Sequence, residues 1–480
     1  MSNLSELLPT GGGQNSVDFV ATGTLSSGQT VALKADGTVS AVTGDTVGTS
    51  VIFGAASTVI SATFDPTNNK VVIAYNDVGN SNYGTAIVGT VSGTSISFGT
   101  AVVFESTSII NYPASAIYDS NANRIVIAYS DVASSRFGTA IVGTVSGTTI
   151  SFGTAVVFES AITYSPSATF DSTNNKVVIA YVDGNNSNYG TAIVGTVSGT
   201  SISFGTAVVF KTYAIIDPSP TFDSTNGKVV IAYRDSGNSG YGTAIVGTVS
   251  GTAISFGTAV VFESATSNSI SATYDSTNNK VVIAYRDAGN SSYGTAIVGT
   301  VSGTSISFGT PVVFESASSS YISSTYDSNA NKTVIAYRNV GNSGYGTAIV
   351  GTVSGTAISF NTPTIFESES STYISSTYDS TNNKVVIAYS NYDGGYEGKG
   401  VVFTVGSPTN TDFIGITAEA ISDTATGPVN VYGGINTVQT GLTIASDYYV
   451  QADGTLSTTT STVKAGQAIS ATTINMKDLT

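Results

Sequence analysis

A short apolar motif that ends in tyrosine recurs along most of the chain. The motif V-V-I-A-Y, or a close variant, places its last residue at Tyr75, Tyr129, Tyr181, Tyr233, Tyr285, Tyr337 and Tyr389. The first spacing between these tyrosines is 54 residues and the next five are 52. A period that is held this constantly is typical of a repeat architecture, in which each repeat forms one small supersecondary unit.

Each repeat predicts four short β-strands. In the repeat around Tyr285 the apolar stretches cover residues 270–275, 280–285, 293–301 and 305–314. The first two are separated by D-S-T-N-N-K and the last two by V-S-G-T, which are sequences that favour tight turns. Tight turns make neighbouring strands antiparallel, so the repeat is typical of a propeller blade. The sequence therefore predicts an all-β fold with a seven-bladed β-propeller; a β-solenoid is the alternative, but its coils are usually shorter.

The two ends of the repeat array complement each other. After Tyr389 the chain offers only one further apolar strand, at 400–405, so the last blade lacks its fourth strand. Residues 48–53, G-T-S-V-I-F, match the fourth-strand sequence G-T-A-V-V-F at 99–104. We therefore expect an N-terminal strand to close the last blade, which removes the open sheet edges of the array.

The segments that flank the repeats resemble each other. V-A-L-K-A-D-G-T-V-S (31–40) and Y-V-Q-A-D-G-T-L-S (449–457) both place Asp-Gly between apolar residues, a strong hairpin signal. We predict that residues 16–46 and 407–480 form one small discontinuous β domain into which the propeller, residues 47–406, is inserted. Residues 1–15, which are polar and rich in glycine, are expected to form a flexible arm.

Composition excludes several classes of function. The chain has no Cys and no His, so thiol nucleophiles, Ser-His-Asp triads and the usual zinc sites cannot form. A net charge of −15 with only 16 basic residues argues against nucleic acid as a partner. No apolar run is long enough to cross a bilayer, and the N-terminus lacks the features of a signal peptide. Carboxylate chemistry remains, but no pair of acids is convincingly placed for glycoside hydrolysis, so we expect no enzyme.

The segment after the fourth strand differs from blade to blade, whereas the tight turns hardly change. These segments, which we interpret as loops on one face, are 106–113, 160–166, 211–218, 264–269, 316–321 and 368–373. Tyrosine and arginine suit the contact of a protein or sugar ligand. The candidate ligand-binding residues are Tyr112, Tyr164, Tyr213, Tyr321, Tyr373, Arg234, Arg286 and Arg338. The alternative is that exposed loops vary simply because packing does not constrain them.

Acidic residues also recur at fixed positions. Five aspartates follow the motif tyrosine by two residues and precede a polar turn: Asp77, Asp131, Asp183, Asp235 and Asp287. They could cap the turn or help to bind Ca²⁺, and we expect no cofactor other than this ion. A second set, Glu105, Glu159, Glu263, Glu315 and Glu367, is interrupted by Lys211. We expect these glutamates either to face the arginines on the same surface or to remain solvated.

The repeat G-N-S-x-Y-G-T-A-I-V-G-T-V-S-G-T-x-I-S-F at 289–308 resembles the repeats of propeller-bearing virion proteins of tailed phages of marine bacteria. The flanking segments 17–25, 413–423, 440–458 and 465–473 resemble the small β attachment domain of such appendage and decoration proteins. The resemblance implies a non-enzymatic structural protein of the virion, assembled in the host cytoplasm and extracellular on the released particle.

In that role the β domain would attach to other virion proteins, with the chain as a homo-oligomer on the particle. The propeller would be displayed outward, as a capsid decoration or a tail fibre component that binds host-surface glycan during attachment. The alternative is a secreted bacterial glycan-binding or surface-layer propeller protein.

Overall fold

The protein is described from a computed structural model, which covers residues 15–34, 36–109, 114–406, 412–451, 453–461 and 463–476. It forms two compact units. The propeller comprises Val47–Thr404, and the β domain combines the described residues up to Thr46 with those from Val405 onward. The predicted arm, 1–15, lies outside the described residues except for Asn15. Helical segments in the part of the chain that is described are short, and none could span a membrane.

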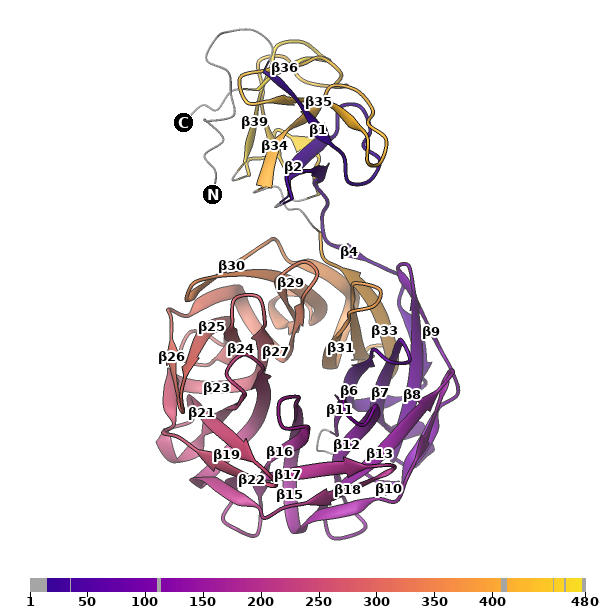
Figure 1. The fold of residues 1–480 in the computed structure, drawn as a ribbon, viewed down its shortest axis with the longest axis vertical. Coiled ribbons are helices and arrows are strands. Elements are labelled where there is room, and N and C mark those ends of the chain that lie inside the picture. Colours follow the sequence, from indigo (N-terminus) through magenta and orange to yellow (C-terminus); the bar gives the residue numbers. More distant parts are fainter. Residues whose placement is uncertain are drawn as a thin grey trace. The chain divides into compact units, whose positions relative to one another are not determined.

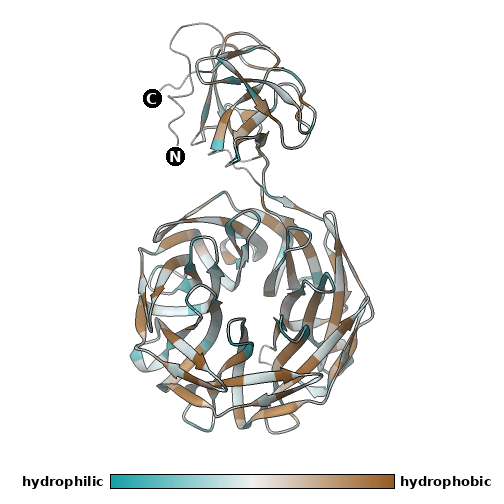
Figure 2. Ribbon diagram, in the orientation of Figure 1, coloured by the Kyte–Doolittle hydropathy of each residue, from teal (hydrophilic) through white to brown (hydrophobic). Residues whose placement is uncertain are grey.

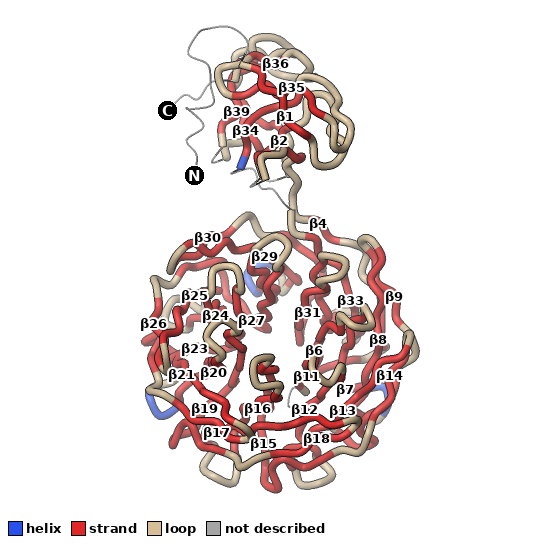
Figure 3. The backbone as a smooth tube through the Cα atoms, in the orientation of Figure 1, coloured by secondary structure: helices blue, strands red, loops and turns tan. Residues whose placement is uncertain are grey.

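The propeller is built from antiparallel sheets that surround a central space (Figure 1). Blades are numbered by the order of their motif tyrosine, so that Tyr75 lies in the first. Strands dominate the backbone, and the connections are short turns (Figure 3).

The strands take equivalent places in successive blades. The second strands are β7 (Lys70–Asp77), β12 (Arg124–Asp131), β16 (Lys176–Asp183), β20 (Lys228–Asp235), β24 (Lys280–Asp287), β28 (Lys332–Asn339) and β32 (Lys384–Asn391). The third strands are β8 (Tyr83–Ser92), β13 (Phe137–Ser146), β17 (Tyr189–Ser198), β21 (Tyr241–Ser250), β25 (Tyr293–Ser302), β29 (Tyr345–Ser354) and β33 (Glu397–Thr404). Short outer strands follow at β9 (Ser95–Phe98), β14 (Thr149–Phe152), β18 (Ser201–Phe204), β22 (Ala253–Phe256), β26 (Ser305–Phe308) and β30 (Ala357–Phe360).

Five of the six segments interpreted as variable loops are strands, and for these that interpretation was wrong; the sixth, 106–113, lies partly outside the described residues. A single long strand forms the outer edge of one blade and continues as the inner strand of the next. In the first blade the inner strand is β6 (Ser57–Asp65) and the outer strand β10 (Val102–Ser108); β11 (Ser115–Asp119) is the inner strand of the second. The long strands are β15 (Val156–Asp171), β19 (Val208–Asp223), β23 (Val260–Asp275), β27 (Val312–Asp327) and β31 (Thr364–Asp379).

Backbone pairing explains why the crossover stays extended. In β23, Val260–Thr266 pairs with β21 of the fourth blade, and Ser267–Asp275 pairs with β24 of the fifth. The register with β24 shifts between Asn268 and Ser271, just after the chain has passed from one blade to the next. The crossover also bonds to the connection after the second strand, for example from Ala288 N to Thr266 O at 2.9 Å. The two kinds of connection therefore lie on the same face, as predicted.

Packing between blades accounts for the unbroken apolar motif. On β7, Val72 and Ala74 pack toward the second blade, whereas Val71, Ile73 and Tyr75 pack toward the seventh. Both faces of this strand are thus buried, which favours a continuous apolar run over alternation. Apolar residues accordingly follow the strands around the propeller (Figure 2).

The predicted closure of the last blade is confirmed. Strand β5 (Val51–Gly54) pairs antiparallel with β33, with Val51 opposite Gly400 and Ile52 opposite Lys399, and β4 (Thr46–Val47) extends the same sheet. Phe53 packs against Tyr75, with ring centroids 5.3 Å apart. The last blade is thus completed by a strand from the other end of the array.

The described residues of the β domain form two five-stranded sheets. The first has the order β1-β35-β34-β2-β3 and the second the order β36-β40-β39-β37-β38. Their bounds are β1 (Ser16–Val20), β2 (Thr30–Leu33), β3 (Val39–Ala41), β34 (Phe413–Thr417), β35 (Thr426–Val431), β36 (Ile435–Asn436), β37 (Asp447–Val450), β38 (Leu456–Ser457), β39 (Lys464–Ala468) and β40 (Ile474–Asn475).

The two Asp-Gly hairpins of the β domain have the same bonds. Thr38 N donates to Asp36 Oδ1 at 3.0 Å, and Thr455 N donates to Asp453 Oδ1 at 2.9 Å. Strands from both ends of the chain pair within the first sheet, because β1 and β2 pair with β35 and β34.

Candidate ligand-binding site at the central cavity

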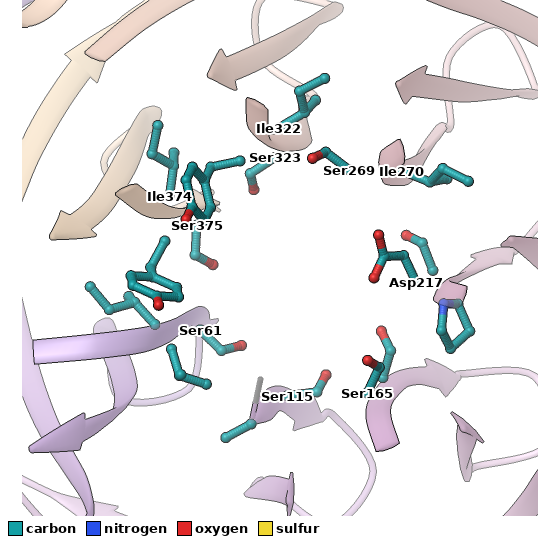
Figure 4. Close-up of a pocket in the computed structure, with 18 of the residues that line it drawn as sticks. Ser61, Ser115, Ser165, Asp217, Ser269, Ile270, Ile322, Ser323, Ile374 and Ser375 are labelled. Carbon is teal, nitrogen blue, oxygen red and sulfur yellow. The ribbon is translucent and has the colours of Figure 1, made fainter. Parts of the chain in front are cut away.

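The inner strands of the propeller surround a cavity of about 490 Å³ (Figure 4). This volume is in the range of small-molecule sites. Blades contribute three neighbouring residues at the start of the inner strand, as Val59, Ile60 and Ser61 do in the first. The third position carries a serine at Ser61, Ser115, Ser167, Ser219, Ser323 and Ser375. The cavity wall therefore presents a ring of hydroxyl groups.

The serine hydroxyls also join neighbouring blades. Ser61 Oγ accepts a hydrogen bond from Ala116 N at 3.0 Å, and Ser375 Oγ accepts one from Ala62 N at 2.9 Å. The second of these bonds links the last blade to the first. Because the oxygen accepts from the backbone, the O–H group can still donate to a ligand in the cavity.

The first of the three positions varies, and its backbone has an unusual conformation. The residues there have positive φ angles: Val59 (54°), Ser165 (45°), Asp217 (50°), Ser269 (47°), Tyr321 (50°) and Tyr373 (49°). Non-glycine residues rarely adopt this left-handed region, and residues held there cluster at functional sites. The register shift of the crossover is the local cause, and it places these variable side chains in the cavity wall.

Four tyrosines form a cluster beside the cavity, which we call the tyrosine cluster: Tyr321, Tyr373, Tyr392 and Tyr396. The rings of Tyr321 and Tyr373, both lining the cavity, are 5.3 Å apart. Tyr392 and Tyr396 come from the connection after β32, and their rings meet edge to face at 5.1 Å. Burial and the neighbouring Tyr321 and Tyr396 raise the pKa of Tyr373. Tyr392 is 50% exposed and Tyr396 36%, so the cluster offers aromatic surface to a ligand.

Asp217 supplies the one carboxylate among the described lining residues. Burial raises its pKa, and the backbone N–H of Ser269 and the charge of Arg234 partly oppose that increase. Its carboxylate points toward the open centre of the cavity (Figure 4).

Of the five predicted tyrosines, Tyr321 and Tyr373 line the cavity. Tyr112 lies outside the described residues. Tyr164 packs against an apolar core shared by the third and fourth blades. Tyr213 is 60% exposed and does not line the cavity, and the centroid of its ring lies 5.8 Å from Lys211 Nζ.

The three predicted arginines are partly buried beneath the crossovers and do not line the cavity. Arg234 Nη1 donates to Asn268 Oδ1 at 2.8 Å, and Arg286 Nη2 donates to Ser292 Oγ at 3.0 Å. Arg338 Nε is buried beside Gly344 and has no hydrogen-bond partner in the part of the chain that is described. Ligand binding by the predicted tyrosines and arginines stays a prediction.

The repeated glutamates do not pair with the arginines, contrary to one expectation. All five accept a hydrogen bond from the motif tyrosine of the next blade, as Glu263 does from Tyr285 OH at 2.9 Å. The others pair as Glu105 with Tyr129, Glu159 with Tyr181, Glu315 with Tyr337 and Glu367 with Tyr389. A hydroxyl donor directly opposite the carboxylate explains this arrangement, because it lies closer than any arginine.

The repeated aspartates cap turns in four blades. Asp287 Oδ1 accepts from Gly289 N at 2.9 Å, and Asp131, Asp183 and Asp235 make equivalent bonds. Asp77 makes no such bond. Within the described ranges, no group of three or more acidic side chains is placed to hold a metal ion. Calcium binding by these aspartates stays a prediction.

Sequence reasoning missed Asp217, Tyr392 and Tyr396. Asp217 lies in the segment 211–218, and the only sequence signal that this segment could contact a ligand is that it varies between blades. The connection S-N-Y-D-G-G-Y at 390–396 departs from the G-N-S-x-Y sequence of other blades, and that departure was the available signal.

No protein-family model matches the sequence, and no curated protein matches it. The structure is similar to that of the BP39L lectin from Burkholderia pseudomallei, with a TM-score of 0.52 and 12% identity over 73% of this chain and 96% of that chain. It is more distantly similar to a leech intramolecular trans-sialidase in complex with 2,7-anhydro-Neu5Ac (TM-score 0.43, 9% identity, 73% of this chain and 68% of that chain). Saccharomyces cerevisiae Sqt1 gives a TM-score of 0.44 and 12% identity, over 81% of this chain and 99% of that chain.

Together with the strand pairing, the likeness to the lectin confirms the predicted all-β propeller fold.

Proposed function

We propose that the propeller binds carbohydrate at the mouth of its central cavity, and that the chain does so as a non-enzymatic structural protein of a phage virion. The observation that carries the first part is the tyrosine cluster beside a cavity lined with hydroxyl groups. Aromatic rings offer flat contact surface at low entropic cost, and hydroxyls offer donors and acceptors to the oxygens of a sugar.

The chemistry of the cavity supports binding without catalysis. Glycoside hydrolysis commonly uses two carboxyl groups that flank the scissile bond. Among the described residues that line the cavity, Asp217 alone carries a carboxylate. The fold is similar to that of the BP39L lectin, a likeness that is consistent with a sugar-binding propeller but shows only the fold.

The virion role rests on the resemblance of the repeats and flanking segments to phage appendage and decoration proteins. In this proposal the β domain attaches the chain to other virion proteins, and the propeller contacts host-surface glycan. Cryo-EM of purified particles tests it: density for the propeller on the capsid or tail is expected. Absence of the chain from particles, with its presence in the medium of a bacterial culture, would favour the secreted alternative.

Carbohydrate binding is tested on a glycan array with the full chain. We expect Tyr392→Ala and Tyr373→Ala to lower affinity for the bound glycan by about five- to thirtyfold, because each removes stacking surface worth on the order of 1–2 kcal/mol. Tyr213→Ala is the matched comparison, since Tyr213 is exposed like Tyr392 but lies outside both the tyrosine cluster and the cavity lining. Equal loss in all three variants would place binding away from the cluster, and no binding to any glycan would overturn the proposal.

A further inference from the structure

Asp217 is the only charged side chain among the described residues that line the cavity. It lies at the start of the inner strand of the fourth blade, whereas Tyr321 and Tyr373 belong to the sixth and seventh. Figure 4 shows the Asp217 carboxylate facing Ser375 and Ile374 of the seventh blade across the open space. A ligand in this cavity can therefore contact the carboxylate on one side and aromatic rings on the other.

The Asp217 carboxylate has no ion-pair partner within 4.0 Å among the described residues. Arg234, which is opposite Ile216 on the neighbouring strand β20, acts on it only at longer range and donates instead to Asn268. On the flanking blades, the first of the three lining positions is occupied by the uncharged residues Ser165 and Ser269. Burial raises the pKa of Asp217, so its ionised form is poorly compensated. A cationic group on the ligand would supply the missing compensation.

The tyrosine rings and the net charge of the protein also favour a cationic ligand. The faces of tyrosine rings attract cations, and the net charge of −15 draws cations toward the protein. An acidic sugar would instead be repelled by the Asp217 carboxylate. The three arginines could not offset this repulsion by direct contact, because they do not line the cavity.

From this geometry, and resting on the proposed carbohydrate binding, we infer that the cavity takes a sugar with a free, positively charged amine, such as a de-N-acetylated amino sugar. The ammonium group pairs with Asp217, the apolar face of the sugar packs on Tyr321 and Tyr373, and the serine hydroxyls donate to the sugar oxygens.

Isothermal titration calorimetry with the full chain tests this inference. Glucosamine oligomers are compared with N-acetylglucosamine oligomers of equal length and with uronic acid oligomers, at about pH 6, where the amine is protonated. We expect glucosamine oligomers to bind about tenfold more tightly than the N-acetylated ones. Asp217→Asn should remove that preference, whereas Asp36→Asn, which makes the same charge change in an exposed turn of the β domain, should leave it unchanged.

The pH profile adds a second readout. The preference requires ionised Asp217, whose pKa is raised, so it should be lost as pH falls through a value above that of an ordinary aspartate. The Asp217→Asn variant should show no such change. Equal binding of both oligomers, or tighter binding of uronic acid oligomers, would overturn the inference but leave carbohydrate binding standing. If no oligomer binds and the glycan array is also blank, both proposals fail.

Discussion

The motif tyrosines have nearly identical surroundings but differ in what their hydroxyl groups contact. Tyr285 donates to Glu263, and burial together with that carboxylate raises its pKa, so the hydroxyl stays protonated as a donor. In the third blade Lys211 replaces the glutamate, and the buried hydroxyl of Tyr233 in the fourth blade has no hydrogen-bond partner among the described residues. A single substitution in one blade thus leaves a polar atom of the next blade unsatisfied.

This difference between Tyr285 and Tyr233 gives a paired prediction. Tyr285→Phe should lower the free energy of unfolding by about 1–2 kcal/mol, because the partly buried Glu263 loses its donor. Tyr233→Phe removes a hydroxyl that has no partner, so stability should be unchanged or slightly higher. Denaturant unfolding of both variants measures the effect, and an equal loss in the two would show that the bond to Glu263 contributes nothing.

At the scale of elements, the junction between the third and fourth blades differs from the others. Pro220 on β19 has no N–H to donate to Ser167, whereas Ala272 N in the next blade donates to Ser219 Oγ at 2.9 Å. The bond from tyrosine to glutamate is missing here as well. In its place Lys211 Nζ lies 2.6 Å from Asp235 Oδ2, and the Asp235 side chain is only 3% exposed. An ion pair therefore replaces hydrogen bonds at this junction.

Breaking that ion pair should be costly. Lys211→Ala leaves the Asp235 carboxylate buried without its counter-charge and should lower the free energy of unfolding by about 3 kcal/mol. Adding Asp235→Asn removes the uncompensated charge, so the double variant should recover part of the loss. A double-mutant cycle in denaturant measures the coupling, and strictly additive losses would mean that the pair is not coupled.

At the scale of the whole molecule, closure of the ring depends on a strand from the far end of the repeats. Strand β5 pairs with β33, and Phe53 joins a core that also contains Tyr75 of the first blade and Val402 of the last. The strands of the propeller from β5 to β33 lie within Val47–Thr404. The β domain has its own apolar cores.

The propeller is therefore expected to fold without the β domain. A chain of residues 47–404 should give a cooperative thermal transition within a few degrees of that of the propeller in the full chain. A chain of residues 55–404 lacks β5, exposes the edge of β33 and should aggregate or melt at a markedly lower temperature. Circular dichroism and light scattering compare the two, and equal stability would show that the closing strand is dispensable.

Sequence by itself was sufficient for the features that depend on local pattern. The spacing of the tyrosine motif predicted the propeller, and the match of residues 48–53 to a fourth strand predicted the closing strand. The capping role of aspartates such as Asp287 was one of two interpretations, and the geometry shows it. These features could be predicted because strands, turns and caps depend on neighbouring residues, and because the repeat shows which strand the last blade lacks.

Only the tertiary structure decided the candidate site. Variable sequence predicts loops, but the crossovers are paired on both sides and stay extended, and their register shift turns Asp217, Tyr321 and Tyr373 toward the cavity. Tyr392 and Tyr396 join them from a connection that has no counterpart of the same sequence in other blades. The inner strands of all the blades surround the cavity, and its serines recur with the repeat. The residues at the first lining position do not repeat, so the sequence pattern could not show that Asp217, Tyr321 and Tyr373 share one cavity.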